Sequence, residues 1–249
     1  MRNLKITLAY DGFDFNGWQV QPGLPTIQGL LQAALERLTG EKVLPQGSGR
    51  TDAGVHAFAQ VASCAIESPI PADNLVVALN DALPPAIRVL RVDEAAPDFH
   101  ARGSARAKTY RYRIHRGAVC PLFSARYVYH HPYPLDEAAM ITVAHQVVGE
   151  HDFTSFAAVD PERGRDEPAS NVRRIFFSGW ERSGDELVYT VRGSGFLHHM
   201  VRNLVGTFIL VGKGTLQVED VKRVLEARTR SAAGATAPAS GLYLVSVEY

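Results

Sequence analysis

The sequence predicts an α+β fold made of two tandem ferredoxin-like units, each with an antiparallel sheet and the order β-α-β-β-α-β. Three observations support this prediction. Apolar residues alternate with a period of two in some segments and recur every three or four residues in others. Segments of these two kinds follow the same order in both halves of the chain. The chain has 249 residues, 46% of them hydrophobic, which is enough for one large domain or two small ones. We expect a cleft between the two units, where ligand sites are common.

The first half contains the clearer signals. Residues 4–10 alternate as a strand. Thr26 is a good N-cap residue, and the apolar residues after it recur at helical spacing as far as Gly40. The other predicted elements are strands at 42–48, 56–66 and 87–92, and a helix from Pro71 to about Leu83.

The second half repeats this order with one added helix. The repeat is inferred from the pattern, because the two halves share no obvious identity. We therefore predict two domains, 1–100 and 101–249, joined within residues 96–107. A loop is expected at 158–170, where the sequence is polar and has no period. The predicted elements are strands at 108–114, 172–181, 186–192 and 241–249, and helices at 135–149, 197–211 and 218–227.

Composition narrows the class of protein. The sequence contains no apolar run long enough to cross a membrane and no signal segment at its start, so we expect a cytoplasmic protein without a membrane partner. Cys64 and Cys120 are the only cysteines, which provides neither a disulfide framework nor a paired-cysteine zinc pattern. The formal net charge is zero, so overall charge does not indicate a nucleic-acid binder.

Local charge is more informative. Residues 100–116, HARGSARAKTYRYRIHR, contain six lysines and arginines and no acid. Basic residues interleaved with tyrosines suit a ligand with phosphates and bases, such as RNA. An arginine-rich strand exposed to solvent is the alternative. Alternation places Tyr110 and Tyr112 on one face of the strand and Arg111 and Arg113 on the other. Tyr112 fits a buried core position, whereas the Tyr110 ring fits either the core or stacking on a base.

The helix GFLHHMVRNLVGTFILVG is amphipathic. Its apolar residues, among them Leu204 and Phe208, form one buried stripe, and His198, Arg202 and Gly206 form a second stripe. Arg202 fits either a solvated helix face or a position pointing into a cleft. The pairs His130–His131 and His198–His199 are adjacent residues, which on a helix diverge by about 100°. With no acid or cysteine at a ligand spacing, we expect no metal site. The stretch GSGRTDAGVHAFAQ lacks a nucleotide-binding fingerprint and contains one carboxylate, Asp52.

Several motifs together resemble one family along nearly the whole chain: YDGFDFNGWQVQP, GRTDAGVHAFAQ, ARAKTYRYRI, HDFTSF, GFLHHMVRNLVG and APASGLYL. The chain resembles the bacterial-type tRNA pseudouridine synthase A family, whose members isomerise uridines at positions 38–40 in the anticodon stem-loop of tRNA. The resemblance implies that Asp52 is the essential aspartate, that Tyr110 stacks on the target uracil, and that Arg202 pairs with the aspartate. It also implies that Arg50 assists the RNA or the loop, and that the protein is a homodimer that uses no cofactor and no metal.

This chemistry is consistent with one carboxylate, several arginines and a tyrosine. The C1′–N1 bond of uridine breaks, the uracil turns, and C5 bonds to C1′, so no redox or group-transfer cofactor is required. The positive character that develops at C1′ can be met by a carboxylate. Two other classes remain as alternatives, a non-catalytic RNA-binding protein and a hydrolytic glycosidase or nuclease. The latter ordinarily needs a second carboxylate or clustered metal-binding acids.

Overall fold

The computed structural model describes residues 1–159 and 170–249, so most of the predicted loop 158–170 lies outside the described residues. The chain divides into two compact units, the first made of Met1–Lys108 with Tyr243–Tyr249 and the second of Thr109–Leu242. The C-terminal strand β10 (Leu242–Glu248) is thus grouped almost entirely with the first unit, because it pairs in parallel with β3 (His56–Ile66). A division at residue 100 would have placed this strand in the second half.

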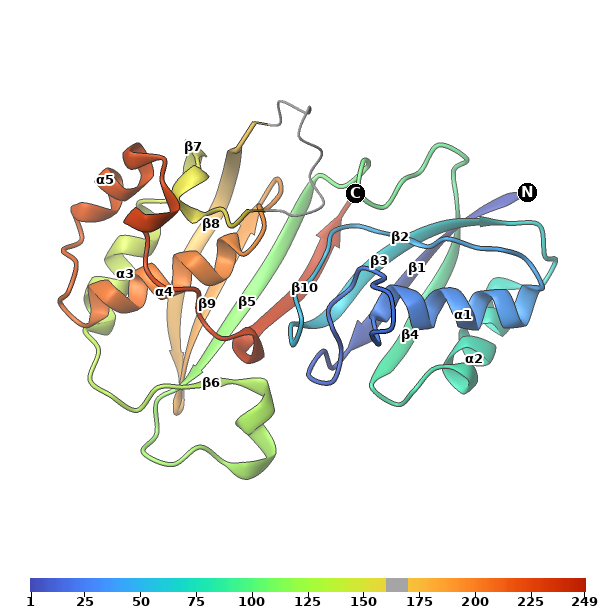
Figure 1. Ribbon diagram of the computed structural model, residues 1–249, viewed down its shortest axis with the longest axis horizontal. Coiled ribbons are helices and arrows are strands. Elements are labelled where there is room, and N and C mark those ends of the chain that lie inside the picture. The colour runs from blue at the N-terminus through green and yellow to red at the C-terminus, as the bar shows by residue number, and fades with distance from the viewer. Residues whose placement is uncertain (160–169) are drawn as a thin grey trace. The chain divides into compact units, whose positions relative to one another are not determined.

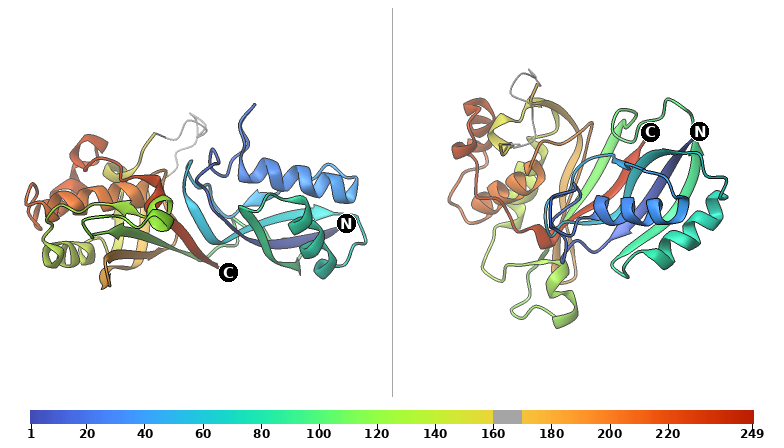
Figure 2. Two further views of the ribbon diagram at one scale, coloured as in Figure 1. Left: turned by 90° about the horizontal axis from the view of Figure 1, so that it is seen from below. Right: turned by 45° about the vertical axis from the view of Figure 1, so that its right-hand side comes forward.

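The first unit is a sheet with two helices, α1 and α2 (Figures 1 and 2). Its strands lie in the order β4-β1-β3-β10, and the short β2 pairs with β3. β1 is antiparallel to both β3 and β4. Figure 2 shows helix α1 running along one face of this sheet. The bounds of the elements are β1 Arg2–Tyr10, α1 Ile27–Thr39, β2 Gln46–Gly47, α2 Ala72–Ala82 and β4 Ile87–Ala95.

Helix α1 begins and ends where the sequence predicts. The Thr26 side chain accepts a hydrogen bond from the Gly29 N–H at 3.3 Å, which satisfies one of the donors of the first turn that has no partner within the helix. Gly40 ends the helix with φ of 73°, a left-handed conformation that glycine adopts without a steric penalty.

An irregularity in the pairing of β1 with β3 affects the position of the candidate site. Leu8 lies opposite Gln60, yet Tyr10, two residues later, lies opposite Ala57, three residues earlier on β3. The extra residue on β3 is a β-bulge, a feature that redirects side chains locally. Residues directly opposite one another share a face of the sheet, so Gln60 projects on the same face as Leu8 and Tyr10.

Two predicted elements differ clearly from the structure, and a third, the helix expected at 197–211, begins only at Met200. Only Gln46–Gly47 of the expected strand 42–48 pairs as a strand, since Pro45 has no N–H to offer a ladder. The expected helix 135–149 is shorter: α3 spans Glu137–His145 and is followed by a strand, β7 (Gly149–Asp152), that the sequence pattern does not predict. Gly149 begins this strand with φ of 111°, which is incompatible with continuing the helix.

The second unit has the strand order β5-β9-β8-β7, with the short β6 parallel to β5. The pairs β7·β8 and β8·β9 are antiparallel. With the first unit, this confirms the prediction of an α+β fold with mainly antiparallel pairing. Helix α4 packs against β9, since the rings of Phe208 and Tyr189 have centroids 5.5 Å apart, and Figure 1 shows the two elements together. The remaining elements are β5 Ala107–His115, β6 Tyr129–His130, β8 Val172–Ser183, β9 Glu186–Gly193, α4 Met200–Gly212 and α5 Asp220–Ala227, with 3₁₀ turns at Leu122–Tyr127, Thr154–Phe156, Arg230–Ala232 and Ala239–Gly241.

Helix α4 is buried on most of its surface and supports the segment 229–238. The predicted apolar stripe is confirmed, with Leu204 and Phe208 fully buried. On another side, the fully buried Asn203 accepts hydrogen bonds from Thr236 Oγ1 at 2.7 Å and Arg230 at 3.0 Å. In the part of the chain that is described, no helix is both long and apolar enough to cross a membrane.

Gly206 allows the segment 229–238 to approach the backbone of α4. A Cβ at this position would overlap the carbonyl oxygen of Ala235. The close contact between helix and segment therefore depends on the lack of a side chain here.

Replacing Gly206 by alanine should destabilise the second unit. In an open helix, alanine would add up to about 1 kcal/mol of stability relative to glycine. Here the new methyl group meets the Ala235 carbonyl, and overpacking of this kind costs about 1–3 kcal/mol. We expect a lower midpoint in urea unfolding, whereas Thr142→Ala, at an exposed position on α3, should change it little. An unchanged midpoint for Gly206→Ala would contradict the close packing.

The two cysteines should react at very different rates. Cys64 is buried on β3, and burial, aided by the charge of Glu41, raises the pKa of its thiol to about 12. Because the thiolate is the reactive form, Cys64 should resist thiol reagents at neutral pH, while the half-exposed Cys120 reacts. Titration with a thiol reagent should detect one fast-reacting cysteine in the native protein and two after unfolding. Two fast thiols in the native protein would be inconsistent with a buried Cys64.

Candidate functional site

Asp52 lies in residues 48–55, which connect β2 to β3 and are called the Asp52 loop below. The Val55 N–H donates to the Asp52 carbonyl at 3.1 Å and closes a tight turn. Within this turn Gly54 has φ of 78°, a conformation that favours glycine. The Asp52 side chain is half-buried, and Arg50, two residues earlier, is exposed. The turn therefore fixes the backbone on the C-terminal side of the candidate catalytic carboxylate.

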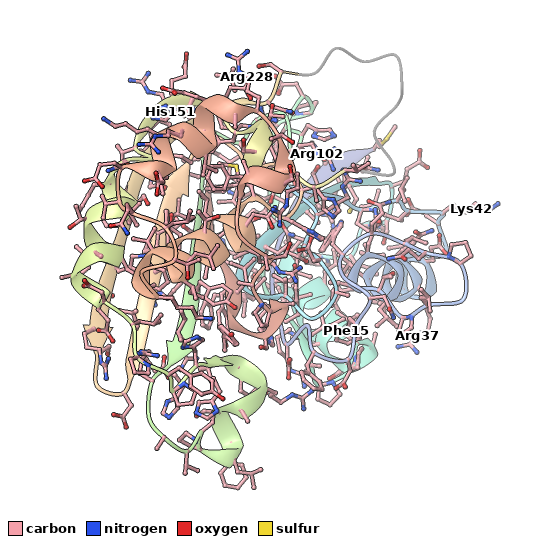
Figure 3. All side chains as sticks on the ribbon, turned by 60° about the vertical axis from the view of Figure 1, so that its left-hand side comes forward. Phe15, Arg37, Lys42, Arg102, His151 and Arg228 are labelled. Atoms are coloured by element: carbon pink, nitrogen blue, oxygen red, sulfur yellow. The ribbon has the colours of Figure 1, made fainter. Side chains whose placement is uncertain are left out.

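The segment after β1, residues 11–19, holds the loop from one side. The Trp18 N–H donates to the Thr51 carbonyl at 3.0 Å, and the Gly54 N–H donates to the carbonyl of Phe15 at 3.3 Å (Phe15 is labelled in Figure 3). Gly17 has φ of 82°, and a Cβ there would lie only 2.5 Å from the Thr51 carbonyl oxygen. Only glycine permits both this backbone conformation and this close approach.

Two further glycines allow the same packing. A Cβ at Gly12 would overlap the Val55 carbonyl, and one at Gly47 would lie 2.5 Å from the Trp18 ring. The sequence pattern does not single out Gly12, Gly17 or Trp18 as parts of the site. The available signal is the pair of glycines among the aromatic residues of YDGFDFNGW. Such glycines suggest a close backbone contact, but the sequence does not identify the segment that they contact.

A buried polar network anchors the Asp52 loop to the sheet. Gln60, fully buried on β3, donates to the Gly49 carbonyl at 2.9 Å and accepts from the Ser48 hydroxyl at 2.6 Å. Tyr10, at the end of β1, shares a hydrogen bond of 2.8 Å with Thr51 Oγ1. Burial raises the pKa of Tyr10 to about 12, so its hydroxyl keeps its proton over the physiological range. The sequence indicates neither Gln60 nor Tyr10 as a site residue.

Tyr110 lies on β5 in the second unit. The predicted alternation is confirmed, because Tyr110 and Tyr112 are buried while Arg111 and Arg113 on the other face are half-buried. The Tyr110 ring packs edge-on against Phe196, with centroids 5.0 Å apart and an interplanar angle of 78°. Such edge-to-face contacts are favourable and fix the orientation of the ring.

Arg202 lies in the first turn of α4 and is half-buried. Its Nε donates to the Ala237 carbonyl at 2.7 Å, and the Ala237 N–H donates back to the Arg202 carbonyl at 3.1 Å. The adjacent Pro238 carbonyl accepts the Tyr112 hydroxyl at 2.8 Å. Burial raises the pKa of Tyr112, and the nearby charge of Arg202 opposes this shift. The segment 229–238 thus links the Arg202 helix to β5.

The expectation that His198 and His199 diverge is wrong. Their ring centroids are 3.9 Å apart, with an interplanar angle of 40°. His199 has φ of 57° and precedes the first residue of α4, so the 100° helical step does not apply to this pair.

The basic stretch 100–116 is only partly available to a ligand. The Arg113 guanidinium binds both carboxylate oxygens of Glu186, at 2.7 and 2.6 Å. The Arg116 side chain, almost entirely buried, is 3.3 Å from a Glu137 oxygen. Arg102, by contrast, is exposed (labelled in Figure 3). Acids distant in the sequence thus neutralise part of the stretch, which the local pattern could not reveal.

The sequence-predicted residues are therefore divided between the two units. Asp52 and Arg50 belong to the first, and Tyr110 and Arg202 to the second. The first holds a carboxylate on an anchored loop, and the second holds an oriented aromatic ring and a guanidinium.

Comparison with known proteins agrees with these features. The family model described as tRNA pseudouridine synthase matches residues 6–102 and 143–249. The chain is 58% identical over its full length to a protein of Solibacter usitatus named tRNA pseudouridine synthase A, and the alignment covers all of that protein. Proteins of the same name from Brevibacillus brevis and Moorella thermoacetica are 45% and 47% identical, over 100% and 99% of both chains.

The family match includes the Asp52 loop, the glycine segment that holds it, and helix α4 with the segment 229–238. Residues 1–5 and 103–142 fall outside the match, and these include the whole of β5 with Tyr110. The full-length relatives extend across these parts as well. The chain belongs to the tRNA pseudouridine synthase family.

Proposed function

We propose that this protein is a tRNA pseudouridine synthase that isomerises uridine to pseudouridine at positions 38–40 in the anticodon stem-loop of tRNA. The observation that carries the proposal is the 58% identity, over the whole of both chains, to a protein named tRNA pseudouridine synthase A. The anchored Asp52 loop supports it, since it supplies a positioned carboxylate for chemistry at a sugar.

The reaction is an isomerisation and needs no net oxidant, reductant or group donor. The C1′–N1 bond breaks, C5 of the uracil bonds to C1′, the C5 proton leaves, and N1 gains a proton. Asp52 can act by attack on C1′, by addition to the uracil ring or by removal of a proton from C2′. In all three routes the reaction uses a carboxylate held at a fixed position, and the turn at 52–55 fixes the backbone that carries this one.

The other site residues have complementary roles in the proposal. The uracil must leave its stack, and the Tyr110 ring, oriented by Phe196, would replace the lost stacking. The Arg202 guanidinium would pair with Asp52, favour its ionised form and fix its orientation. Arg50, which is exposed and lies two residues before Asp52 in the chain, would contact the RNA backbone or stabilise the loop.

The proposal extends to architecture and partners. We take the two predicted domains, 1–100 and 101–249, as tandem ferredoxin-like units, the first carrying the catalytic loop and the second the stacking tyrosine and the arginine helix. The antiparallel β4-β1-β3-β2 arrangement of the first unit supports this for that half. The working form would be a cytoplasmic homodimer that acts on tRNA.

The proposal can be tested with purified protein and unmodified tRNA. Digestion to nucleosides should reveal pseudouridine, and sequencing should place it at positions 38–40. A tRNA with cytidine at those positions should remain unmodified and serve as the control. Tight binding of tRNA without any pseudouridine would favour the alternative of a non-catalytic RNA-binding protein.

Replacing Asp52 by asparagine should abolish turnover while leaving binding nearly intact. Asparagine keeps the size of the side chain but removes its charge and nucleophilicity. Loss of such a group ordinarily slows a reaction by about a thousandfold or more, equivalent to ~4 kcal/mol of barrier. Single-turnover pseudouridine formation and tRNA binding should be measured together, and tRNA affinity should stay within a few-fold of the parent.

Asp81→Asn, at an exposed position on α2, is the matched control and should retain the parent rate. Asp52→Glu keeps the charge but displaces it by about one methylene, and an ångström of misplacement can cost about a hundredfold. Near-parent turnover by a folded Asp52→Asn protein would assign Asp52 the role of a turn residue only.

A further inference from the structure

Gln60 is the buried centre of the network beneath the Asp52 loop. It is fully buried, and all four of its amide hydrogen-bonding positions are used. Its Oε1 accepts from Ser48 Oγ at 2.6 Å and from the Val61 N–H at 3.1 Å. Its Nε2 donates to the Gly49 carbonyl at 2.9 Å and to the Tyr10 hydroxyl at 3.4 Å. A buried network satisfied in this way resists rearrangement, because breaking one of its hydrogen bonds leaves a buried polar group without a partner.

Tyr10 extends this network to the residue next to Asp52. Since the Tyr10 oxygen accepts from Gln60, its own proton is available for Thr51 Oγ1, 2.8 Å away. Thr51 is itself buried, and its carbonyl accepts the Trp18 N–H at 3.0 Å. Both the side chain and the backbone of the residue before Asp52 are therefore fixed.

The network joins the loop to the most regular part of the first unit. Tyr10 and Gln60 lie on β1 and β3, which pair along almost their whole length. In a regular ladder Tyr10 would lie opposite Phe58, whereas the bulge sets it opposite Ala57. The bulge therefore adjusts the position from which the Tyr10 hydroxyl reaches the loop.

We propose that Tyr10 and Gln60 are positioning residues for Asp52: their hydrogen bonds to residues 48–51 carry the rigidity of the sheet to the carboxylate. The proposal rests on the proposed function and extends it to two residues that touch no substrate in it. A functional group must be held to within a fraction of an ångström, and a supporting layer of hydrogen bonds is the usual means.

Tyr10→Phe is the sharpest test, because it removes one hydroxyl and keeps the ring. Tyr189→Phe is its matched control. Tyr189 is also fully buried, and its hydroxyl shares a hydrogen bond of 2.8 Å with Ser178, but it lies on β9 in the second unit. Both variants should lose similar thermal stability. Only Tyr10→Phe should lower kcat, by about tenfold to a hundredfold, with KM for tRNA within about threefold of the parent.

Thr51 supplies a conservative rescue. Thr51→Ser keeps the hydroxyl that meets Tyr10 and should retain most of kcat, while Thr51→Val keeps the shape and should resemble Tyr10→Phe. Because Tyr10 and Thr51 act through one hydrogen bond, the double variant Tyr10→Phe/Thr51→Val should be no slower than the worse single variant.

Amide hydrogen exchange gives a readout that does not depend on turnover. Exchange within residues 48–55 should speed up in Tyr10→Phe and stay at the parent rate in Tyr189→Phe. A parent protein that forms no pseudouridine would overturn the proposed function, while exchange would still report whether the network holds the loop. Parent-like exchange and kcat in Tyr10→Phe, or equal losses of kcat in both tyrosine variants, would overturn the positioning roles.

Discussion

The Asp52 loop is irregular backbone between two strands, yet Ser48 and Thr51 within it are buried. Buried peptide groups without partners cost free energy, so the partners must come from elsewhere in the fold. Residues 11–19 supply them on one side, and Gln60 with Tyr10 supplies them on the other. The backbone position of Asp52 depends on these partners.

The second unit meets the same requirement in a similar way. The irregular segment 229–238 is held by the polar side of α4, chiefly Asn203 and Thr207, which are both fully buried. The backbone carbonyls of that segment accept hydrogen bonds from the Arg202 guanidinium and the Tyr112 hydroxyl. In both units, regular elements hold an irregular segment in place. The segment of the first unit carries Asp52, whereas that of the second contacts Arg202, which lies on the helix itself.

Glycine is used in both units for close approach. Gly17 packs closely against the Thr51 carbonyl, and Gly206 packs closely against the Ala235 carbonyl. In each case a backbone carbonyl occupies the space that a side chain would need. This precision is useful for an isomerisation of uridine, because such a reaction depends on protein groups held at fixed positions.

The sequence was sufficient to predict the α+β class, most helices and strands, the burial of Tyr112 and the family resemblance. These depend on local periodicity, capping and short motifs, which a linear pattern records. It did not determine the length of β2, the presence of β7, the pairing of β10 with β3, or the proximity of the His198 and His199 rings. The residues that hold the Asp52 loop could not be predicted in this way, because they come together only in the folded chain. Tyr10 and Gln60 are 50 residues apart in the chain and meet because β1 pairs with β3 through a bulge, a non-local event that periodicity does not encode.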